Sequence, residues 1–442
     1  MIMNKRIPKL LLALSSVIAI NGFSTSAQAI ELVPTVEDAI LHSPEFRQQV
    51  KEKQGVQADL RGAEGGWLPS VDLAAGIGKE KIEADAFATD WDETRREASI
   101  RVTQNLFEGF GTQNEIKRQE ARLESSRHAT EAAANKIALD MVTSYMNLLK
   151  EQQLLNLAEE NRLTHERILD QIIQRSQAGV GNQVEVDQAK ARLALANANV
   201  TASKNNYQDV LTRFHRVLGR FPDSDLVKPN MDINIPNTLE EAINTALMLH
   251  PTLRSANADI SEARAQYQAA NKLMYPRVDI EISQTYDDNV NRVQGEYKDF
   301  QAMLRLRYNL FNGGKDQAII DRTASDIYQS AEVRNNTRRE TIENLRYAWE
   351  ATNFLGEQLI FQQQQIDSTL ETLKGYRQQF SLGRRSLLDL LNTEDEYVRA
   401  KIGFITSETD YMVAKFRVQN GMGTLVDTLG IKVNYDQTVA QK

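Results

Sequence analysis

The stretch Asn309-Leu310-Phe311-Asn312-Gly313-Gly314 repeats an earlier stretch, Asn105-Leu106-Phe107-Glu108-Gly109, that lies 204 positions before it. The same offset takes Gly179 to Gly383. Two other motifs return in the same order: Val36-Glu37-Asp38-Ala39-Ile40 as Leu239-Glu240-Glu241-Ala242-Ile243, and Trp67-Leu68-Pro69 as Met274-Tyr275-Pro276. Short matches that keep their order and their spacing indicate a duplicated structural unit.

The duplication divides the chain into two repeats, over residues 30–218 and 238–425. Residues 219–237 are expected to connect them, because this segment contains three prolines, which interrupt regular structure: Pro222, Pro229 and Pro236. Residues 426–442 are expected to form a C-terminal tail.

The first 29 residues have the three parts of a secretory signal peptide. A basic start is followed by an apolar stretch over residues 10–20 and by the small-residue pattern Ala27-Gln28-Ala29. The alternative is a membrane anchor, but a spanning helix needs about 20 apolar residues, and Ser15 and Ser16 interrupt this stretch. Residues 1–29 are therefore predicted to direct export and to be removed.

The composition excludes several classes of function. Acidic residues outnumber basic ones by 60 to 52, and the net charge of −8 argues against a nucleic acid partner. The absence of cysteine excludes disulfides, thiolate metal sites and a lipid-modified cysteine. The five histidines form no His-Glu-x-x-His pair, and Asn312-Gly313-Gly314-Lys315 lacks the spacing of a phosphate-binding loop. We therefore expect no enzyme activity and no cofactor.

Two long spans without proline predict unusually long helices. No proline lies between Pro69 and Pro222 or after Pro276. Apolar residues recur in these spans on a seven-residue grid, as coiled-coil packing requires: Met141, Leu148, Leu155 and Leu169, and then Leu345, Leu359, Ile366, Leu373 and Phe380. The grid predicts helices over about residues 112–178 and 315–382, each about 100 Å long.

Each long helix is predicted to end at a glycine and to be followed by a return helix. Gly179 and Gly383 can adopt the left-handed conformation that commonly ends a helix. Two capping boxes follow, in which a short polar residue precedes an acidic residue by three positions: Asn182 with Glu185, and Ser386 with Asp389. Return helices are expected over about residues 183–218 and 387–420, so each repeat contains a helical hairpin.

Four segments have the two-residue period of β-strands. They are predicted over about residues 70–78, 97–107, 278–285 and 300–311. In the last segment Leu304 and Leu306 fall on one face, and Arg305 and Arg307 fall on the other; Arg101 lies on the polar face of the second segment. Polar loops are expected to join the strands of each pair, near residues 79–97 and 285–299.

Strands of about ten residues with one apolar face are what a membrane β-barrel needs. Lipid cannot hydrate unpaired backbone groups, so such a barrel must close. Four strands are too few, since the smallest single-chain barrels have about eight. If these strands enter a bilayer, several chains must share one barrel, with Arg101, Arg305 and Arg307 in its lumen. The alternative is a soluble antiparallel sheet with one wet face.

The duplicated plan and the stretch Phe380-Ser381-Leu382-Gly383-Arg384-Arg385-Ser386-Leu387-Leu388-Asp389 resemble the TolC family of outer-membrane efflux and type I secretion proteins. The resemblance covers about residues 32–425. It implies an α+β membrane protein in which three chains share a twelve-stranded β-barrel in the outer membrane of a Gram-negative bacterium and extend a coiled-coil tunnel into the periplasm. The partners that it implies are outer-membrane lipid, a periplasmic adaptor and an inner-membrane ABC or proton-driven transporter.

The resemblance also implies a closed periplasmic entrance at the two helical turns. The residues at matching positions are Glu185, Phe380, Arg385 and Asp389. In the family the arginine ties neighbouring helices together, and the aspartate narrows the entrance. Asn392 stands where the family often has a second aspartate, so the sequence does not decide whether the entrance has one acidic ring or two. The alternative for Glu185 and Asp389 is that they only cap their own helices, worth up to about 1 kcal/mol each.

The sequence therefore predicts the exit channel of a type I secretion or multidrug efflux system. The alternative is a periplasmic coiled-coil adaptor or scaffold protein of a transport complex. An adaptor would share the export signal and the heptads, but it has no reason to contain two pairs of barrel-like strands.

Overall fold

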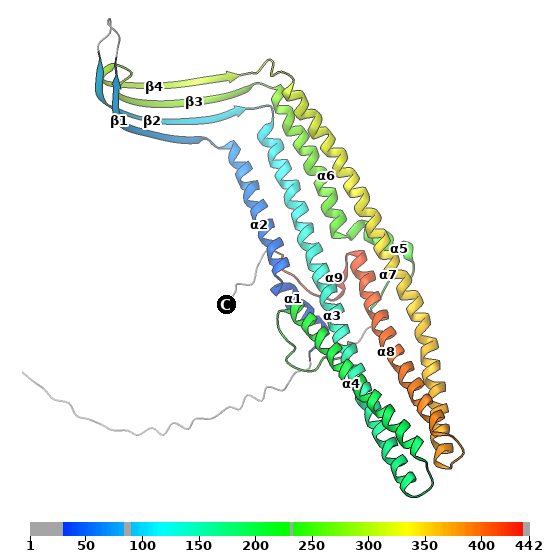
Figure 1. The fold of residues 1–442 in the computed structure, drawn as a ribbon. Helices are drawn as coiled ribbons and strands as arrows, with labels where there is room; N and C mark the ends of the chain where they lie inside the picture. The colour runs from blue at the N-terminus through cyan, green and yellow to red at the C-terminus, as the bar shows by residue number, and fades with distance from the viewer. Residues whose placement is uncertain (1–29, 84–89, 230–232, 436–442) are drawn as a thin grey trace, which may run out of the picture.

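The computed structural model describes residues 30–83, 90–229 and 233–435. The expected signal peptide, residues 1–29, lies outside these residues. Figure 1 shows a β-sheet at one end of the molecule and long helices that run from it to two hairpin turns at the other end. Across the described ranges, no helix is both long enough and apolar enough to cross a membrane.

One antiparallel sheet contains the named strands of the described chain, in the order β1-β2-β3-β4. Each repeat contributes two of them: β1 (Ser70–Ile82) and β2 (Trp91–Phe107), and then β3 (Arg277–Val290) and β4 (Val293–Arg307). The two repeats meet where β2 pairs with β3. Within the described residues, β1 and β4 therefore each have one unpaired edge.

The predicted strand limits were wrong at the polar ends. Most of the segments expected as loops, 79–97 and 285–299, belong to the ladder. Charged and polar residues occur on both faces of the sheet there, so the two-residue period disappears while the backbone pairing continues. Cross-strand ion pairs accompany the first of these extensions, between Lys79 and Asp92 (3.2 Å) and between Arg95 and Glu80 (3.0 Å).

The last strand also ends earlier than predicted, at Arg307 instead of Phe311. The chain must turn from the sheet into the next helix, and it does so at Gly313 and Gly314, whose φ angles are +60° and +79°. The ladder itself ends at the pair Arg277–Arg307, because the partner strand β3 begins at Arg277, directly after Pro276, which has no N–H to donate.

The long helices lie within two residues of their predicted limits. They are α3 (Gly111–Gln177) and α7 (Lys315–Ser381), each of 67 residues, with the return helices α4 (Gln183–Leu218) and α8 (Leu387–Met422). Gly179 and Gly383 have φ angles of +78° and +71°. Both predicted N-caps form, since Asn182 accepts a hydrogen bond from the backbone N–H of Glu185 (2.9 Å) and Ser386 accepts one from that of Asp389 (3.2 Å).

Several shorter helices were not predicted, although a repeated motif falls on two of them. They are α1 (Leu32–His42), α2 (Pro44–Glu64), α5 (Leu239–Leu249), α6 (Pro251–Ala270) and α9 (Leu425–Thr428), with the 3-10 turns η1 (Gly65–Trp67) and η2 (Asn271–Met274). α2 and α6 lead into the strands and pack on both sides of α3. The layer of helices below the sheet therefore contains four members: α2, α3, α6 and α7.

The connector and the tail are held against the middle of α3. Ile30 forms a parallel β-bridge with Leu226 of the connector. The single hydroxyl proton of the buried Tyr145 is shared between two carbonyl oxygens, those of Ile30 (2.8 Å) and Val227 (2.6 Å). Burial raises the pKa of the Tyr145 phenol to about 12, so the hydroxyl remains a donor at ordinary pH. The division of the chain at residues 425/426 was wrong, because it cuts α9, whose first two residues are buried in the same apolar core.

A half-buried histidine distinguishes the second repeat from the first. His250 precedes Pro251 at the start of α6, in the position that Ser43 occupies at the start of α2. Ser43 caps its helix with a long hydrogen bond of 3.5 Å. His250 makes no capping bond, and its Nδ1 is buried with no partner among the described residues. Burial lowers the pKa of His250 to about 4.

We expect His250 to make the protein less stable as the pH falls from about 6.5 to about 4. An unfolded histidine has a pKa of about 6.5, so in this window the unfolded chain binds more protons than the folded one, and the free energy of unfolding falls with the pH. His250→Ser restores the residue of the first repeat. It should raise the unfolding temperature at pH 5 more than at pH 7.5, with a gain of about 1–2 kcal/mol at the lower pH. Thermal unfolding across pH measures this difference, and equal shifts at both pH values would contradict it.

Candidate functional sites

The register of the sheet separates apolar and polar side chains onto two faces. Residues directly opposite each other in an antiparallel pair lie on the same face. Leu304 is opposite Ile280, and Leu306 is opposite Val278. Leu304 and Leu306 are 69% and 67% exposed, although leucine is among the residues most often buried. Exposing this apolar face to water is therefore unfavourable.

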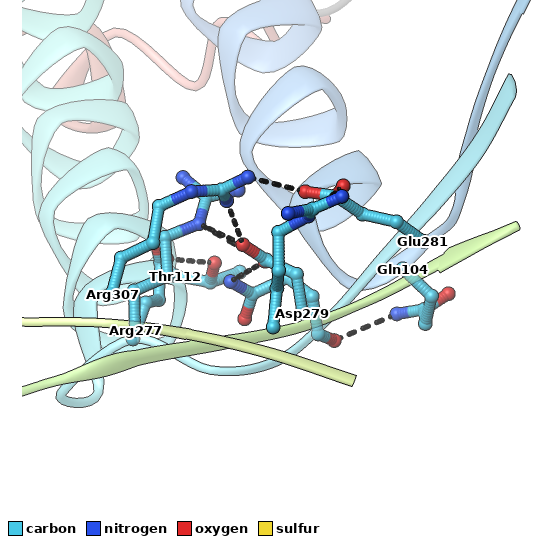
Figure 2. Close-up of polar contacts among 9 residues, drawn as sticks. Gln104, Thr112, Arg277, Asp279, Glu281 and Arg307 are labelled. Atoms are coloured by element: carbon cyan, nitrogen blue, oxygen red, sulfur yellow. Dashed lines mark hydrogen bonds and ion pairs between the residues drawn. The ribbon is translucent and has the colours of Figure 1, made fainter. Parts of the chain in front are cut away.

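The polar face carries a cluster of charged side chains at the end of the sheet that joins α3 (Figure 2). Asp279 is its centre and has no exposed surface. Its carboxylate accepts hydrogen bonds from Arg277 Nε (2.8 Å), Arg307 Nη1 (2.9 Å) and Asn105 Nδ2 (3.1 Å). One buried carboxylate thus ties together β2, β3 and β4.

A second carboxylate extends this cluster. Glu281 accepts a hydrogen bond from Arg305 Nε (2.5 Å) and also pairs with Arg307. Arg101 lies on the same face, where the register sets it opposite Ser283 and Asp72. The three arginines that the sequence placed on a polar face therefore share one face of the sheet, among polar and acidic residues.

At the far end of the molecule, the predicted entrance residues lie at the two hairpin turns. Arg385 contacts its own hairpin: its guanidinium lies 4.3 Å from the ring centroid of Tyr376, its Nε donates to Gln379 Oε1 (3.1 Å), and Asp389 is 3.6 Å away. Within the described chain, no ion pair joins Glu185 to Arg385. A tie by Arg385 to another helical hairpin remains a prediction that concerns neighbouring chains.

Two other arginines connect the hairpins within one chain. The guanidinium of Arg175, on α3, lies 4.8 Å from the ring centroid of Phe380 on α7. Arg192, on α4, donates to Asp395 Oδ2 (2.5 Å) and to Asn392 Oδ1 (2.9 Å) on α8. Asn392 thus receives a hydrogen bond from the first hairpin. Sequence reasoning missed Arg175, Arg192 and Asp395, because no local motif links residues that are about 200 positions apart.

An open cleft of about 710 Å³ lies between the hairpins beside the contact of Arg175 with Phe380. Its lining includes Arg167, Gln171 and Arg175 from α3, and Arg377, Phe380 and Glu394 from the second hairpin. Glu394 is buried and pairs with Arg377 at 2.6 Å. A small apolar cluster and these polar bridges, rather than one continuous core, therefore hold the hairpins together near the turns.

The sheet has an exposed apolar face and a charged opposite face, and long helical hairpins extend from it. These features define a membrane channel protein with a helical extension. The outer membrane efflux protein family matches residues 35–220 and 242–424, and the chain belongs to this family. It is 21% identical to the outer membrane efflux protein BepC of Brucella suis, over 84% of this chain and 80% of BepC. It is also 21% identical to the outer membrane protein TolC of Escherichia coli, over 92% of this chain and 85% of TolC.

The fold agrees with this assignment. The crystal structure of the CmeC outer membrane channel of Campylobacter jejuni superposes with a TM-score of 0.76, at 14% identity, over 96% of this chain and 94% of that one. The predicted family and fold class are confirmed. Members of the family are channel proteins of export systems, located in the outer membrane of Gram-negative bacteria and extending into the periplasm. The chain is therefore an exit channel protein, and the alternative of an adaptor is not supported.

Proposed function

We propose that three copies of the chain form one exit channel, in which each sheet supplies a third of a twelve-stranded barrel. The observation that carries this proposal is the sheet itself, which exposes an apolar face and leaves one edge of β1 and one edge of β4 unpaired in the described chain. Lipid does not tolerate unpaired edges. Pairing β1 of one copy with β4 of the next removes all of them at once.

The polar face then lines the lumen of the barrel, with Arg101, Arg305 and Arg307 in contact with water. The helices continue this lumen through the periplasm toward an adaptor and an inner-membrane ABC or proton-driven transporter. The transporter supplies the energy and delivers the cargo, so the channel itself needs no catalytic residue and no cofactor.

The tip of the helical hairpins acts in this proposal as a gate. The bridges from Arg175 to Phe380 and from Arg192 to Asp395 hold the two hairpins of each chain together in the resting state. Opening must separate the hairpins and expose these side chains to water. Arg192 and Asp395 are partly exposed, so the loss of their ion pair costs little. The contact of Arg175 with Phe380 differs, because Phe380 is buried in the apolar cluster near the turns.

Removing the Arg192 bridge should open the resting channel. We predict that Arg192→Ala raises the resting conductance in planar bilayers several-fold, because Asp395 and Asn392 lose their link to the first hairpin. Arg399→Ala is the matched control, since Arg399 lies 3.5 Å from the same Asp395 but belongs to the same helix. If both variants conduct like the parent channel, the bridge does not hold the gate.

Asp389 provides a separate test of the entrance. Three copies of this carboxylate around one axis should favour cations over anions, so Asp389→Asn should weaken the cation preference of the single channel. Arg385→Ser should leave this preference in place and raise the resting conductance if Arg385 ties neighbouring hairpins. Unchanged selectivity in Asp389→Asn, together with a stability loss of up to about 1 kcal/mol, would mean that Asp389 only caps α8.

A further inference from the structure

Two helix faces at opposite edges of the molecule remain exposed. In the lower half, α4 packs on α3, α3 packs on α8, and α8 packs on α7. α4 and α7 are therefore the outer members of this layer of helices, and Figure 1 shows α7 along its margin. Any ring of identical layers must join the α7 edge of one copy to the α4 edge of the next.

The exposed face of α7 alternates aromatic and acidic residues. Tyr347, Phe354 and Phe361 recur every seven residues and are 61%, 66% and 60% exposed. Glu350 and Glu357 lie between them on the same face and are also exposed. Three large aromatic side chains on one solvent-exposed helix face, at heptad spacing, are typical of a helix that packs on a partner.

The exposed face of α4 carries smaller apolar residues instead. Its apolar members recur at the spacing of one helical face: Val184, Ala191, Leu195, Ala198 and Ala202. This face points away from α3, since residues on the other side of the helix, such as Ala189, Ala196 and Val200, are the buried ones. Arg213 lies on the same exposed face, farther from the turn.

The two faces match when they stand at the same distance from the hairpin turns. Gln358 of α7 is bonded to Ser407 of α8 (3.3 Å), and Asp395 of α8 is bonded to Arg192 of α4. Ser407 lies 12 residues beyond Asp395 on α8, so Gln358 is level with residue 204 of α4, 12 residues beyond Arg192. Phe361 is three residues nearer the turn than Gln358 and is therefore level with residue 201, next to Ala202. The same count sets Glu350 level with residue 212, next to Arg213.

We propose that the α7 face of one copy packs against the α4 face of the next copy at this level, with Phe361 against Ala202 and Glu350 beside Arg213. A large side chain then meets a small one, and an acid meets a base. Rotation about a shared axis keeps corresponding residues at one level, so this heterologous contact closes into a ring. The inference rests on the proposed trimer, and it names the surfaces that form the helical seam between the copies.

Cysteine cross-linking tests this seam, because the parent chain contains no cysteine. We expect Phe361→Cys combined with Ala202→Cys to form an intermolecular disulfide under mild oxidation and to give a covalent trimer on denaturing gels. The matched control combines Phe361→Cys with Thr201→Cys, which sits at the same level but points about 100° away around α4. A disulfide needs Cβ atoms about 4 Å apart, so the control should cross-link at least ten-fold more slowly.

Charge reversal gives an independent measurement. Glu350→Arg and Arg213→Glu should each reduce the fraction of trimer that survives mild heating, and the double variant should restore it. Native mass spectrometry of the parent tests the trimer separately from the seam. A trimer without cross-links at position 202, or with Phe361→Cys linking to itself in a second copy, would overturn the seam but not the trimer. A parent that shows no trimer at all would overturn the proposed function.

Discussion

A chain that carries Leu304→Arg should fail to assemble in the outer membrane. Leu304 lies in the middle of the apolar face of β4, opposite Ile280. An arginine on the lipid side of a barrel near the bilayer midplane costs about 2–4 kcal/mol, and a shared barrel carries this cost once for each copy. We therefore expect the amount of heat-dissociable oligomer in outer-membrane fractions to fall at least ten-fold relative to the parent.

Met303→Arg is the matched control for this variant. Met303 is the neighbouring residue of β4 and lies on the polar face, opposite Glu281. An arginine there faces water and an acidic residue, so the oligomer should form at nearly the parental level. Normal assembly of Leu304→Arg together with loss of assembly in Met303→Arg would mean that the two faces of the sheet are assigned the wrong way round.

Asp279→Ala should be the most destabilising single change on the polar face. The carboxylate is buried and holds two guanidinium groups and one amide. Its removal leaves two neighbouring positive charges without their shared partner. Breaking a fully buried pair costs about 3–5 kcal/mol, but Arg277 and Arg307 are 50% and 54% exposed and regain water. We therefore expect a loss of about 2–3 kcal/mol.

Thermal unfolding of the assembled protein in mild detergent measures this loss. Asp72→Ala is the control, because Asp72 lies on the same face but is exposed, and it should change the unfolding temperature little. Equal unfolding temperatures for the parent and Asp279→Ala would show that the cluster does not hold the strands together.

The two long helices and the two return helices could be predicted almost residue by residue, because the signals that define these four are local. The shorter helices α1, α2, α5, α6 and α9 were not predicted. The heptad grid runs along each long helix. The left-handed glycines Gly179 and Gly383 and the N-caps Asn182 and Ser386 lie within a few residues of the helix ends that they determine. The outer ends of the strands could not be predicted, since the pairing there is carried by the backbone and by ion pairs such as Lys79 with Asp92. The alternation of apolar and polar residues had already ended.

The tip was only partly predictable for a similar reason. The turn motif indicated Glu185, Phe380, Arg385 and Asp389, and these residues do lie at the two turns. The bridges between the hairpins depend on Arg175 and Arg192, which meet partners about 200 residues away. Only the fold brings such pairs together, and no residue spacing within either repeat predicts these contacts.

Native mass spectrometry of the protein extracted from the outer membrane tests the shared barrel most directly. We predict one species of three chains, which separates into single chains only after heating, because each chain alone leaves strand edges unpaired. A species of one chain whose strands remain protected from hydrogen exchange would contradict the shared barrel.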